Sequence, residues 1–408
     1  MPGPRVAYIL PWFPKPSETF ILDEVNTLCR LGLDLTVYTL YGPQDPRLVG
    51  GMAPSLAPVN RLGLPLLKKL AHEAINLKSN WGSQARPFVI RVLARRWRSL
   101  ETMGEAFWAA LAGVYLARSF QSAEIDHIHA PWASGPATAA WVASRLSGIP
   151  FSFCGRAHDV FPDDGALVEK LTDAVMVRTE NQAVKRHLAT LAPPAAGKLV
   201  NIYPGAPLMP IPEPSRPVPP PYHLLALGRF VPKKGYPLLL ESCRRLADLG
   251  VDFRLTLAGD GPERPQIQKL ISKYGLEPRV RLPGFLPHRQ VPSLFQNAHL
   301  FIMSSLIAPS GDRDGIPTVI LEALMHEVPV VASAVSGIPE VIRPGETGWL
   351  VPPGDSRALA QAVMEALTNP QESRRRAQSG RELVKREFAS QKNYAKLKAC
   401  FERLARTV

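Results

Sequence analysis

The sequence has few cysteines, and their spacing argues against two classes of protein. Only four cysteines occur in 408 residues, at positions 29, 154, 243 and 400, and no two of them form a CxxC pair. The disulfide framework of a small secreted domain and a cysteine-based zinc site both need more closely spaced cysteines. We therefore expect four free thiols in a reducing cytoplasm.

Long apolar runs and a targeting segment are also missing. No uncharged apolar stretch reaches the roughly 20 residues that a membrane-spanning helix needs. The amino terminus does not have the charged, apolar and small-residue order of a secretion signal. With 46% hydrophobic and 20% charged residues, the composition is globular rather than disordered. The length suits two domains of about 200 residues each.

The sequence has few acidic residues for its basic content. It contains 35 Asp and Glu but 48 Lys and Arg, which gives a formal net charge of +13. Such an excess suits a nucleic acid, an anionic membrane or an anionic substrate. In residues 61–120, ten basic and three acidic residues are interleaved with tryptophans and aliphatic residues. This pattern is typical of a membrane-surface element. It is also typical of an ordinary amphipathic helix, whose charged face is solvated and whose apolar face packs on the core. The first alternative places Trp81, Arg95, Arg96 and Trp97 at the membrane.

Short apolar runs alternate with helical spacing along most of the chain. Runs such as 5–10, 173–179 and 300–303 are typical of buried strands, and residues 135–147 are typical of a helix. Strands that alternate with helices predict parallel sheets with helices on both faces. Residues 204–221 contain nine prolines in eighteen residues, which is incompatible with a sheet interior and predicts a semi-rigid linker.

The predicted fold class is α/β, with two doubly wound, Rossmann-like domains. Open parallel sheets bind ligands at the carboxyl ends of their strands, so two such domains facing each other would form a cleft. The predicted parts are an amino-terminal domain (1–205), a Pro-rich linker (206–221), a carboxyl-terminal domain (222–388) and a last helix (389–408) packing back toward the first domain.

Residues 311–324, GDRDGIPTVILEAL, place an acidic loop directly before an apolar helix. Pro317 suits the first position of this helix, and Thr318 follows it. The free N–H groups and the positive dipole end of the helix favour an anion such as a phosphate. Asp314 before the helix and Glu322 within it can accept hydrogen bonds from ligand hydroxyls. This order suits the sugar, diphosphate and ribose of a nucleoside diphosphate sugar; the alternative is an acidic cap on an ordinary helix.

A second loop, LGRFVPKKG, lies between a predicted strand and a predicted helix and contains Arg229 and Lys234. A guanidinium and an ammonium group in this position can bind phosphate oxygens, although a basic loop of this kind is often only solvated. In the other domain, His158 follows a strand within the sequence RAHD. It can donate to a sugar hydroxyl or a phosphate, or form a structural hydrogen bond with Asp159.

Several shorter patterns allow a functional and a structural interpretation. Gly259 can line a nucleobase pocket with Phe285 and Leu286, or belong to a plain tight turn. The loop after the first strand can recognise an acceptor or a phosphate, or only cap a helix. The residues of that loop are Ser17, Glu18 and Thr19.

Two patterns that suggest a metal are discounted. Asp312 and Asp314 fit a DxD pattern, but the neighbouring cations and the helix terminus already supply the positive charge that a metal would bring. His127 and His129 straddle a strand end and are expected to face opposite sides, which argues against a ligand pair. No metal is therefore expected.

Taken together, these segments resemble glycosyltransferase family 4, the retaining enzymes of the GT-B fold. The resemblance over residues 224–354 lies in GRFVPKKG, LAGDGPER, GFLPHRQVPSLFQNAHLFIMSS and DGIPTVILEALMHEVPVVASAVSGIPEVI, in family order. In the amino-terminal half, PKPSETFILDEV, DHIHAPWASGPATAAW and FCGRAHDVF are similar to the bacterial exopolysaccharide and colanic-acid branch.

The resemblance implies a role for each matching residue. His158 would orient the donor sugar and Asp314 would contact its hydroxyls, and these two are the implied catalytic residues. The implied diphosphate ligands are Arg229, Lys234 and Thr318, the implied donor-sugar segment is Gly315, Ile316 and Pro317, and the implied ribose ligand is Glu322. Three positions depart from the family pattern: Asp314 stands where Glu is usual, Pro-Ser-Glu-Thr replaces a Gly-Gly loop, and His129-Ala130-Pro131 replaces HAH.

The implied activity is that of a retaining hexosyltransferase. It would move a sugar from a UDP- or GDP-linked donor to a glycan or a lipid-linked glycan in cell-surface polysaccharide synthesis, without a metal or another cofactor. The enzyme would be cytoplasmic, or peripheral on the inner face of the cytoplasmic membrane, with an anionic membrane surface as a further partner. The alternatives are a sugar epimerase or a phosphorylase of the same architecture. A nucleic-acid binder is not expected, because it would not explain why the basic groups flank two acids.

Overall fold

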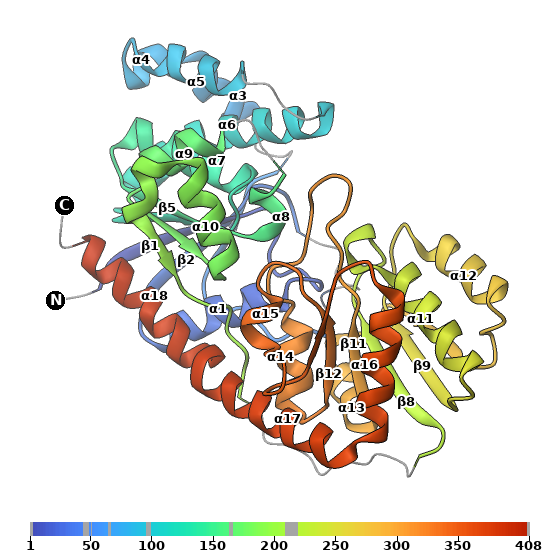
Figure 1. Cartoon of the computed structure of the whole chain (residues 1–408). Helices are drawn as coiled ribbons and strands as arrows, with labels where there is room; N and C mark the ends of the chain where they lie inside the picture. The colour runs from blue at the N-terminus through green and yellow to red at the C-terminus, as the bar shows by residue number, and fades with distance from the viewer. Residues whose placement is uncertain are drawn as a thin grey trace. The chain divides into compact units, whose positions relative to one another are not determined.

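The computed structural model describes residues 3–43, 49, 51–63, 67–94, 99–162, 166–208 and 219–405. The chain divides into two compact units (Figure 1), one formed by Met1–Gly205 with Ser390–Val408 and the other by Ala206–Ala389. Each unit is built on one parallel sheet covered by helices. The predicted class, two parallel-sheet α/β domains of the Rossmann type, is confirmed. Of the predicted Pro-rich linker, residues 209–218 lie outside the described residues.

The sheet of the first unit has seven strands in the order β3-β2-β1-β4-β5-β6-β7, and all neighbouring strands are parallel. The strand order reverses between β1 and β4, so the loops that leave these two strands lie at a topological switch point, where open α/β sheets bind ligands. The strands are β1 (Arg5–Leu10), β2 (Asp34–Thr39), β3 (Val59–Arg61), β4 (His127–Ala130), β5 (Phe151–Gly155), β6 (Met176–Thr179) and β7 (Leu199–Asn201).

Alternating side chains of β1 enter two hydrophobic clusters, one on each face of the sheet. Ala7 and Ile9 pack with helices α6 and α7, whereas Tyr8 and Leu10 pack with α1 and α18. The last helix of the chain therefore belongs to the core of the first unit. The helices are α1 (Thr19–Arg30), α3 (Leu67–Ile75), α4 (Leu77–Trp81), α5 (Ala85–Leu93), α6 (Leu100–Ser122), α7 (Gly135–Ser147), α8 (Ala157–Val160), α9 (Leu167–Asp173), α10 (Gln182–Leu191), a 3-10 helix (Pro193–Lys198) and α18 (Ser390–Ala405).

The second unit has a six-stranded parallel sheet in the order β10-β9-β8-β11-β12-β13. Here the order reverses between β8 and β11, which places the second switch point at the loops that follow these strands. The strands are β8 (Tyr222–Leu227), β9 (Phe253–Ala258), β10 (Val280–Gly284), β11 (Leu300–Met303), β12 (Val330–Ser333) and β13 (Trp349–Val351).

Helices cover both faces of this second sheet, and its core is formed mainly by aliphatic side chains of β8, β9, α11 and α16. The helices are α11 (Tyr236–Asp248), α12 (Arg264–Lys273), α13 (Val291–Asn297), α14 (Thr318–Met325), α15 (Ile338–Val341), α16 (Ser356–Thr368) and α17 (Pro370–Leu383). Two 3-10 helices (Pro232–Lys234 and His288–Gln290) and a π-helix (Val384–Phe388) complete the unit.

The start of α1 corrects one detail of the sequence interpretation. Neither Ser17 nor Thr19 caps this helix: Thr19 is its first residue, and Glu18 occupies the cap position without a side-chain cap hydrogen bond. The Glu18 carboxylate instead pairs with Lys15 at 2.5 Å. Among the described residues, no helix has both the length and the hydropathy that crossing a bilayer requires.

Candidate functional site

Two loops at the switch point of the second unit are joined by an ion pair. Nζ of Lys234, after β8, lies 2.9 Å from Oδ2 of Asp314, which precedes α14. Both side chains are largely buried, with 12% and 8% of their surface exposed. The hydroxyl of Ser305, just after β11, donates to the same Asp314 oxygen at 2.6 Å. The structure therefore brings together two of the predicted site residues and adds Ser305, which the sequence analysis did not single out.

Hydrogen bonds along the backbone hold the same two loops in register. The hydroxyl of Ser304 donates to the carbonyl of Lys234 at 2.9 Å, and the N–H of Leu306 donates to the carbonyl of Lys233 at 2.7 Å. These two bonds tie the backbone of Lys233 and Lys234 to the loop that follows β11. Rigid support of this kind is what a binding site needs.

Gly235 and Gly259 allow these loops to approach closely. A Cβ at Gly235, whose φ is +62°, would lie 2.1 Å from the carbonyl oxygen of Ser304. A Cβ at Gly259, whose φ is +143°, would lie 1.9 Å from the carbonyl oxygen of Gly228. Both backbone conformations also favour glycine. For Gly259 the structure therefore gives a packing role, and its contact with a nucleobase stays a prediction.

Asp312, the other acid of the DxD pattern, is also paired with a lysine. Nζ of Lys233 lies 3.1 Å from Oδ1 of Asp312, so each aspartate in this loop has its own lysine partner. Within the described part of the chain, no group of three His, Cys, Asp or Glu side chains is placed to hold a metal ion.

Arg229 differs from Lys234 in its exposure. Its side chain is exposed, whereas Lys234 is largely buried. Burial lowers the pKa of Lys234, and the charges of Lys233 and Arg229 lower it further, against the opposite effect of Asp314. Arg229 is therefore close enough to Lys234 to influence it electrostatically while remaining open to an anion from solvent. The two cations share one region, as the sequence predicts.

The start of α14 faces the same loop. Thr318 is its first residue and Pro317 is its N-cap, one position earlier than the sequence interpretation places the proline. No side chain caps this end. The N–H of Ile320 donates to the carbonyl of Pro317 at 3.0 Å, which leaves the N–H groups of Thr318 and Val319 without a capping side chain. Asp314 precedes the N-cap by three residues, and Gly315 and Ile316 connect the two. The two N–H groups without a side-chain cap and the helix dipole favour an anion here.

Glu322 lies on α14 beside a residue that the sequence analysis did not select. Its Oε2 is 3.9 Å from Nε2 of His288. Burial raises the pKa of Glu322, and His288 acts in the opposite direction. His288 follows the segment that contains Phe285 and Leu286, and the Phe285 side chain is 53% exposed. The loop predicted to line a nucleobase pocket therefore leads to the acid predicted to bind the ribose.

In the first unit, His158 lies in the short helix α8 directly after β5 and is exposed. Its neighbour Asp159 is buried and accepts hydrogen bonds from the N–H groups of Arg156 (2.8 Å) and Ala133. Burial raises the pKa of Asp159 to about 6. Asp159 thus ties the His158 turn to the loop that follows β4. On α6, burial and the charge of Glu101 raise the pKa of Glu105, and His158 acts in the opposite direction.

Buried salt bridges of the first unit lie next to this turn. Arg178, which is fully buried, pairs with Glu24 at 2.5 Å and with Glu180 at 3.2 Å. Arg156 pairs with the other oxygen of Glu180 and lies over the Trp132 ring, 4.9 Å from its centroid. Because these charges satisfy one another, their evident role is to fix the loops at the carboxyl ends of the strands.

The prediction that His127 and His129 face opposite sides is wrong. Residues two apart in a strand share a face, and Nε2 of His127 and Nδ1 of His129 lie 2.6 and 2.8 Å from the same Ser152 hydroxyl. Both histidines are buried. Burial lowers the pKa of His127 to about 3 and that of His129 well below its usual value. Their role here is a neutral, buried network.

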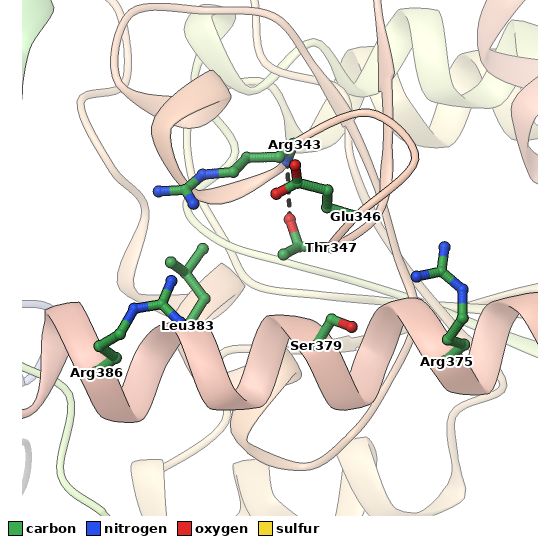
Figure 2. A pocket seen from close by; sticks show the side chains of 7 residues that line it. All are labelled: Arg343, Glu346, Thr347, Arg375, Ser379, Leu383 and Arg386. Atoms are coloured by element: carbon green, nitrogen blue, oxygen red, sulfur yellow. Dashed lines mark hydrogen bonds between the residues drawn. The ribbon is translucent and has the colours of Figure 1, made fainter.

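A separate cavity of about 270 Å³ lies away from these residues (Figure 2). It is formed by the loop before β13 and one side of α17, so it belongs to the edge of the sheet where strands begin. The Lys234 and Asp314 loops follow strand ends, at the opposite edge. The arginines of the cavity already have carboxylate partners, such as Glu387 at 3.4 Å from Arg343 and Glu372 at 2.7 Å from Arg375. The cavity is lined by Arg343, Glu346, Thr347, Arg375, Ser379, Leu383 and Arg386.

Known proteins resemble the chain in sequence and in fold. Residues 211–383 match the family Glycosyl transferases group 1. Over 143 residues the chain is 39% identical to WcaL of Escherichia coli K12, which is named as a colanic acid biosynthesis glycosyltransferase; the match covers 35% of each chain. Over 185 residues it is 35% identical to the amylovoran biosynthesis glycosyltransferase AmsK of Erwinia amylovora, covering 45% of this chain and 46% of AmsK. The matched segments span less than half the length of either relative.

Among solved structures, Anabaena HepE in complex with UDP and glucose is similar over the whole chain. The TM-score is 0.70 at 19% identity, and the alignment covers 97% of this chain and 98% of HepE. The fold is GT-B. Both α/β units therefore have counterparts in glycosyltransferases of known structure.

Proposed function

We propose that the protein is a retaining glycosyltransferase of family 4. It transfers a hexose from a nucleoside diphosphate sugar to a glycan or lipid-linked glycan acceptor in cell-surface polysaccharide synthesis, without a metal. The proposal draws on the match of residues 211–383 to Glycosyl transferases group 1 and on the names of the two sequence relatives. UDP is the first donor nucleotide to test, because the HepE structure contains it; GDP is the second.

One observation carries the proposal: the Lys234–Asp314 pair lies at the switch point, just before the uncapped start of α14. A cation, a carboxylate and helix N–H groups without a side-chain cap are thereby concentrated within one loop region. The cation and the N–H groups can bind a diphosphate, and the carboxylate can accept hydrogen bonds from sugar hydroxyls. Arg229 adds an exposed guanidinium that can bind two phosphate oxygens at once.

In the proposed reaction, the bond between the sugar and the diphosphate breaks and negative charge develops on the leaving diphosphate. Arg229, Lys234 and the N–H groups at Thr318 stabilise that charge, because they are already in place before the reaction. Asp314 and the Gly315–Ile316–Pro317 segment bind the sugar, Glu322 binds the ribose, and His158 orients the sugar. Ser17, Glu18 and Thr19 contribute to the acceptor site, and Gly259, Phe285 and Leu286 to the base site.

No side chain is assigned as a separate nucleophile. The proposed route is therefore front-face attack by the acceptor hydroxyl, whose proton passes to the leaving phosphate. The acceptor oxygen then takes the place of the diphosphate oxygen on the same face of the sugar, and configuration is retained. The predicted cleft between the two domains and its closure over the donor remain predictions.

The test is a thermal-shift screen of UDP, GDP, ADP and their sugars, followed by product analysis. A ligand that binds the native state raises the melting temperature by mass action. With the sugar nucleotide that gives the largest shift, the proposal predicts a glycosylated product only when an acceptor is present. A changed sugar nucleotide without an acceptor would indicate an epimerase, and phosphate-dependent release of a sugar phosphate would indicate a phosphorylase.

A further inference from the structure

Helices α3, α4 and α5 form an insertion between β3 and β4 of the first unit and lie beside α6 (Figure 1). Helix α5 has one buried and one exposed face. In α5, Ala85, Val89 and Val92 enter the hydrophobic core, whereas Arg86, Ile90 and Arg91 are exposed.

Helix α3 also presents exposed residues along one side. Lys68, Lys69, His72 and Ile75 are exposed at helical spacing along one side. Ile75 is 83% exposed and Ile90 of α5 is 54% exposed. Two isoleucines therefore stand on outer helix faces, each among basic side chains and outside the core.

The charges of this insertion are strongly unequal. Its described residues include five exposed cations and one acid, Glu73, which is only 9% exposed. Glu73 is turned inward, where it pairs with Arg118 of α6 at 3.1 Å and accepts a hydrogen bond from Asn80 at 3.0 Å. The outer surface therefore has positive charge that no carboxylate of α3–α5 neutralises. The five exposed cations are Lys68, Lys69, Lys78, Arg86 and Arg91.

We infer that this surface, defined as the exposed residues Lys68, Lys69, Ile75, Lys78, Arg86, Ile90 and Arg91, docks on an anionic lipid bilayer. Cations attract acidic headgroups, and aliphatic side chains among them can enter the interface between headgroups and acyl chains. Ile75 and Ile90 supply the apolar component.

The residues of this docking surface differ from those that the sequence predicts at the membrane. The partly buried Trp81 packs against the core and its indole nitrogen is buried, so it does not point outward. Trp108 donates its indole N–H to the carbonyl of Leu40 at 2.8 Å. Arg95, Arg96 and Trp97 lie outside the described residues. The docking surface rests on lysines, arginines and isoleucines and not on tryptophans.

The inference rests on the proposed function in one respect only: docking would bring the enzyme to a lipid-linked acceptor. Vesicle binding is measured on the full chain without donor or acceptor, and the two hypotheses can fail separately. Each docking variant should keep the wild-type thermal shift with the donor nucleotide. If that shift is absent in the wild type but vesicle binding is present, the function proposal fails and the docking surface stands.

The experiment is co-sedimentation with vesicles of phosphatidylcholine alone or mixed with phosphatidylglycerol. Each cation near an anionic surface contributes about fivefold in partitioning at low salt. Arg86→Glu/Arg91→Glu should therefore lower binding to the mixed vesicles at least ~25-fold, and added salt should weaken wild-type binding. The control Lys269→Glu/Lys273→Glu makes the same charge change on α12 of the second unit and should bind like the wild type.

The apolar component is tested with Ile75→Ser/Ile90→Ser, which should weaken binding to the mixed vesicles without changing its salt dependence. Equal binding of the wild type to neutral and mixed vesicles would overturn the inference, as would equal losses in the α12 control. Nucleic-acid binding in place of vesicle binding would also overturn it. A dimer that is seen in gel filtration and abolished by the charge variants would also overturn the inference, because this face would then contact a second copy of the chain.

Discussion

Nζ of Lys234 lies 2.9 Å from Oδ2 of Asp314, and the pair joins the loops that leave β8 and β11. The cation proposed to bind the donor diphosphate is therefore already neutralised in this structure. Any diphosphate that reaches Lys234 must compete with Asp314 for it or share it. Substitutions of either residue therefore test the role of the pair.

Asp314→Asn should separate nucleotide binding from transfer. The amide removes the negative charge that competes for Lys234, so the free nucleoside diphosphate should bind as tightly as in the wild type or more tightly. Transfer should fall by about 10²-fold, because the carboxylate no longer accepts hydrogen bonds from the sugar in the transition state. Titration calorimetry and initial rates measure the two effects. Weaker nucleotide binding at an unchanged rate would refute the assigned role.

Lys234→Met should destabilise the protein, because it leaves the buried Asp314 carboxylate without its cation. Removing one partner of a buried ion pair typically costs about 3–5 kcal/mol. The double variant with Asp314→Asn should recover most of this loss, since neither charge remains. Urea unfolding measures the four free energies of the cycle. Additive losses in the double variant would show that the two side chains are not coupled.

Gly235→Ala tests whether the loops must approach as closely as the structure shows. The new Cβ would lie 2.1 Å from the Ser304 carbonyl oxygen, so the Lys234 loop must shift and nucleotide binding should be lost. Gly275 is a matched control, because its φ of +63° is nearly the same as +62° at Gly235 but its Cβ would meet no atom within 4 Å. Gly275→Ala should cost about 1 kcal/mol of backbone strain and leave binding unchanged. Equal effects of the two substitutions would argue against the close approach.

The buried histidines predict acid sensitivity of the first unit. Burial lowers the pKa of His127 to about 3 in the folded protein, against about 6.5 in the unfolded chain. The unfolded chain therefore gains the proton first, and the contribution of His127 to stability is complete above pH 6.5 and is lost as the pH falls toward 3. At pH 5 the loss is about 2 kcal/mol. Urea unfolding at pH 7 and pH 5 should show a smaller decrease for His127→Asn than for the wild type, and parallel decreases would contradict this.

The sequence alone predicted the α/β class and most elements, because apolar runs and helical spacing are local signals. The helix Gly135–Ser147 and the strand Leu300–Met303 have the predicted bounds. Predicted strands such as 173–179 are shorter in the structure, where β6 is Met176–Thr179. Apolar residues continue beyond the hydrogen-bonded ladder, so composition alone does not mark where pairing ends.

Site residues that act through long-range contacts could not be found in this way. Ser305 and His288 have no local motif, and only the fold places them beside Asp314 and Glu322. The local sequence suggests Asp159 only as a hydrogen-bond partner of His158, whereas in the structure it accepts hydrogen bonds from backbone N–H groups of two loops. His127 and His129 are a different case, because residues two apart in a strand share a face, so strand periodicity alone places both on one side of the sheet, where they contact Ser152.

The most direct test of the account is titration calorimetry of the best nucleoside diphosphate and of its monophosphate, with the wild type and with Arg229→Ala. Arg229 is exposed, so its removal leaves no buried charge unpaired. We predict that the wild type binds the diphosphate at least about tenfold more tightly than the monophosphate, as a charged hydrogen bond would give. This preference should largely disappear in Arg229→Ala. Equal preference in both proteins, or none in the wild type, would contradict a diphosphate site at the Arg229 and Lys234 loop.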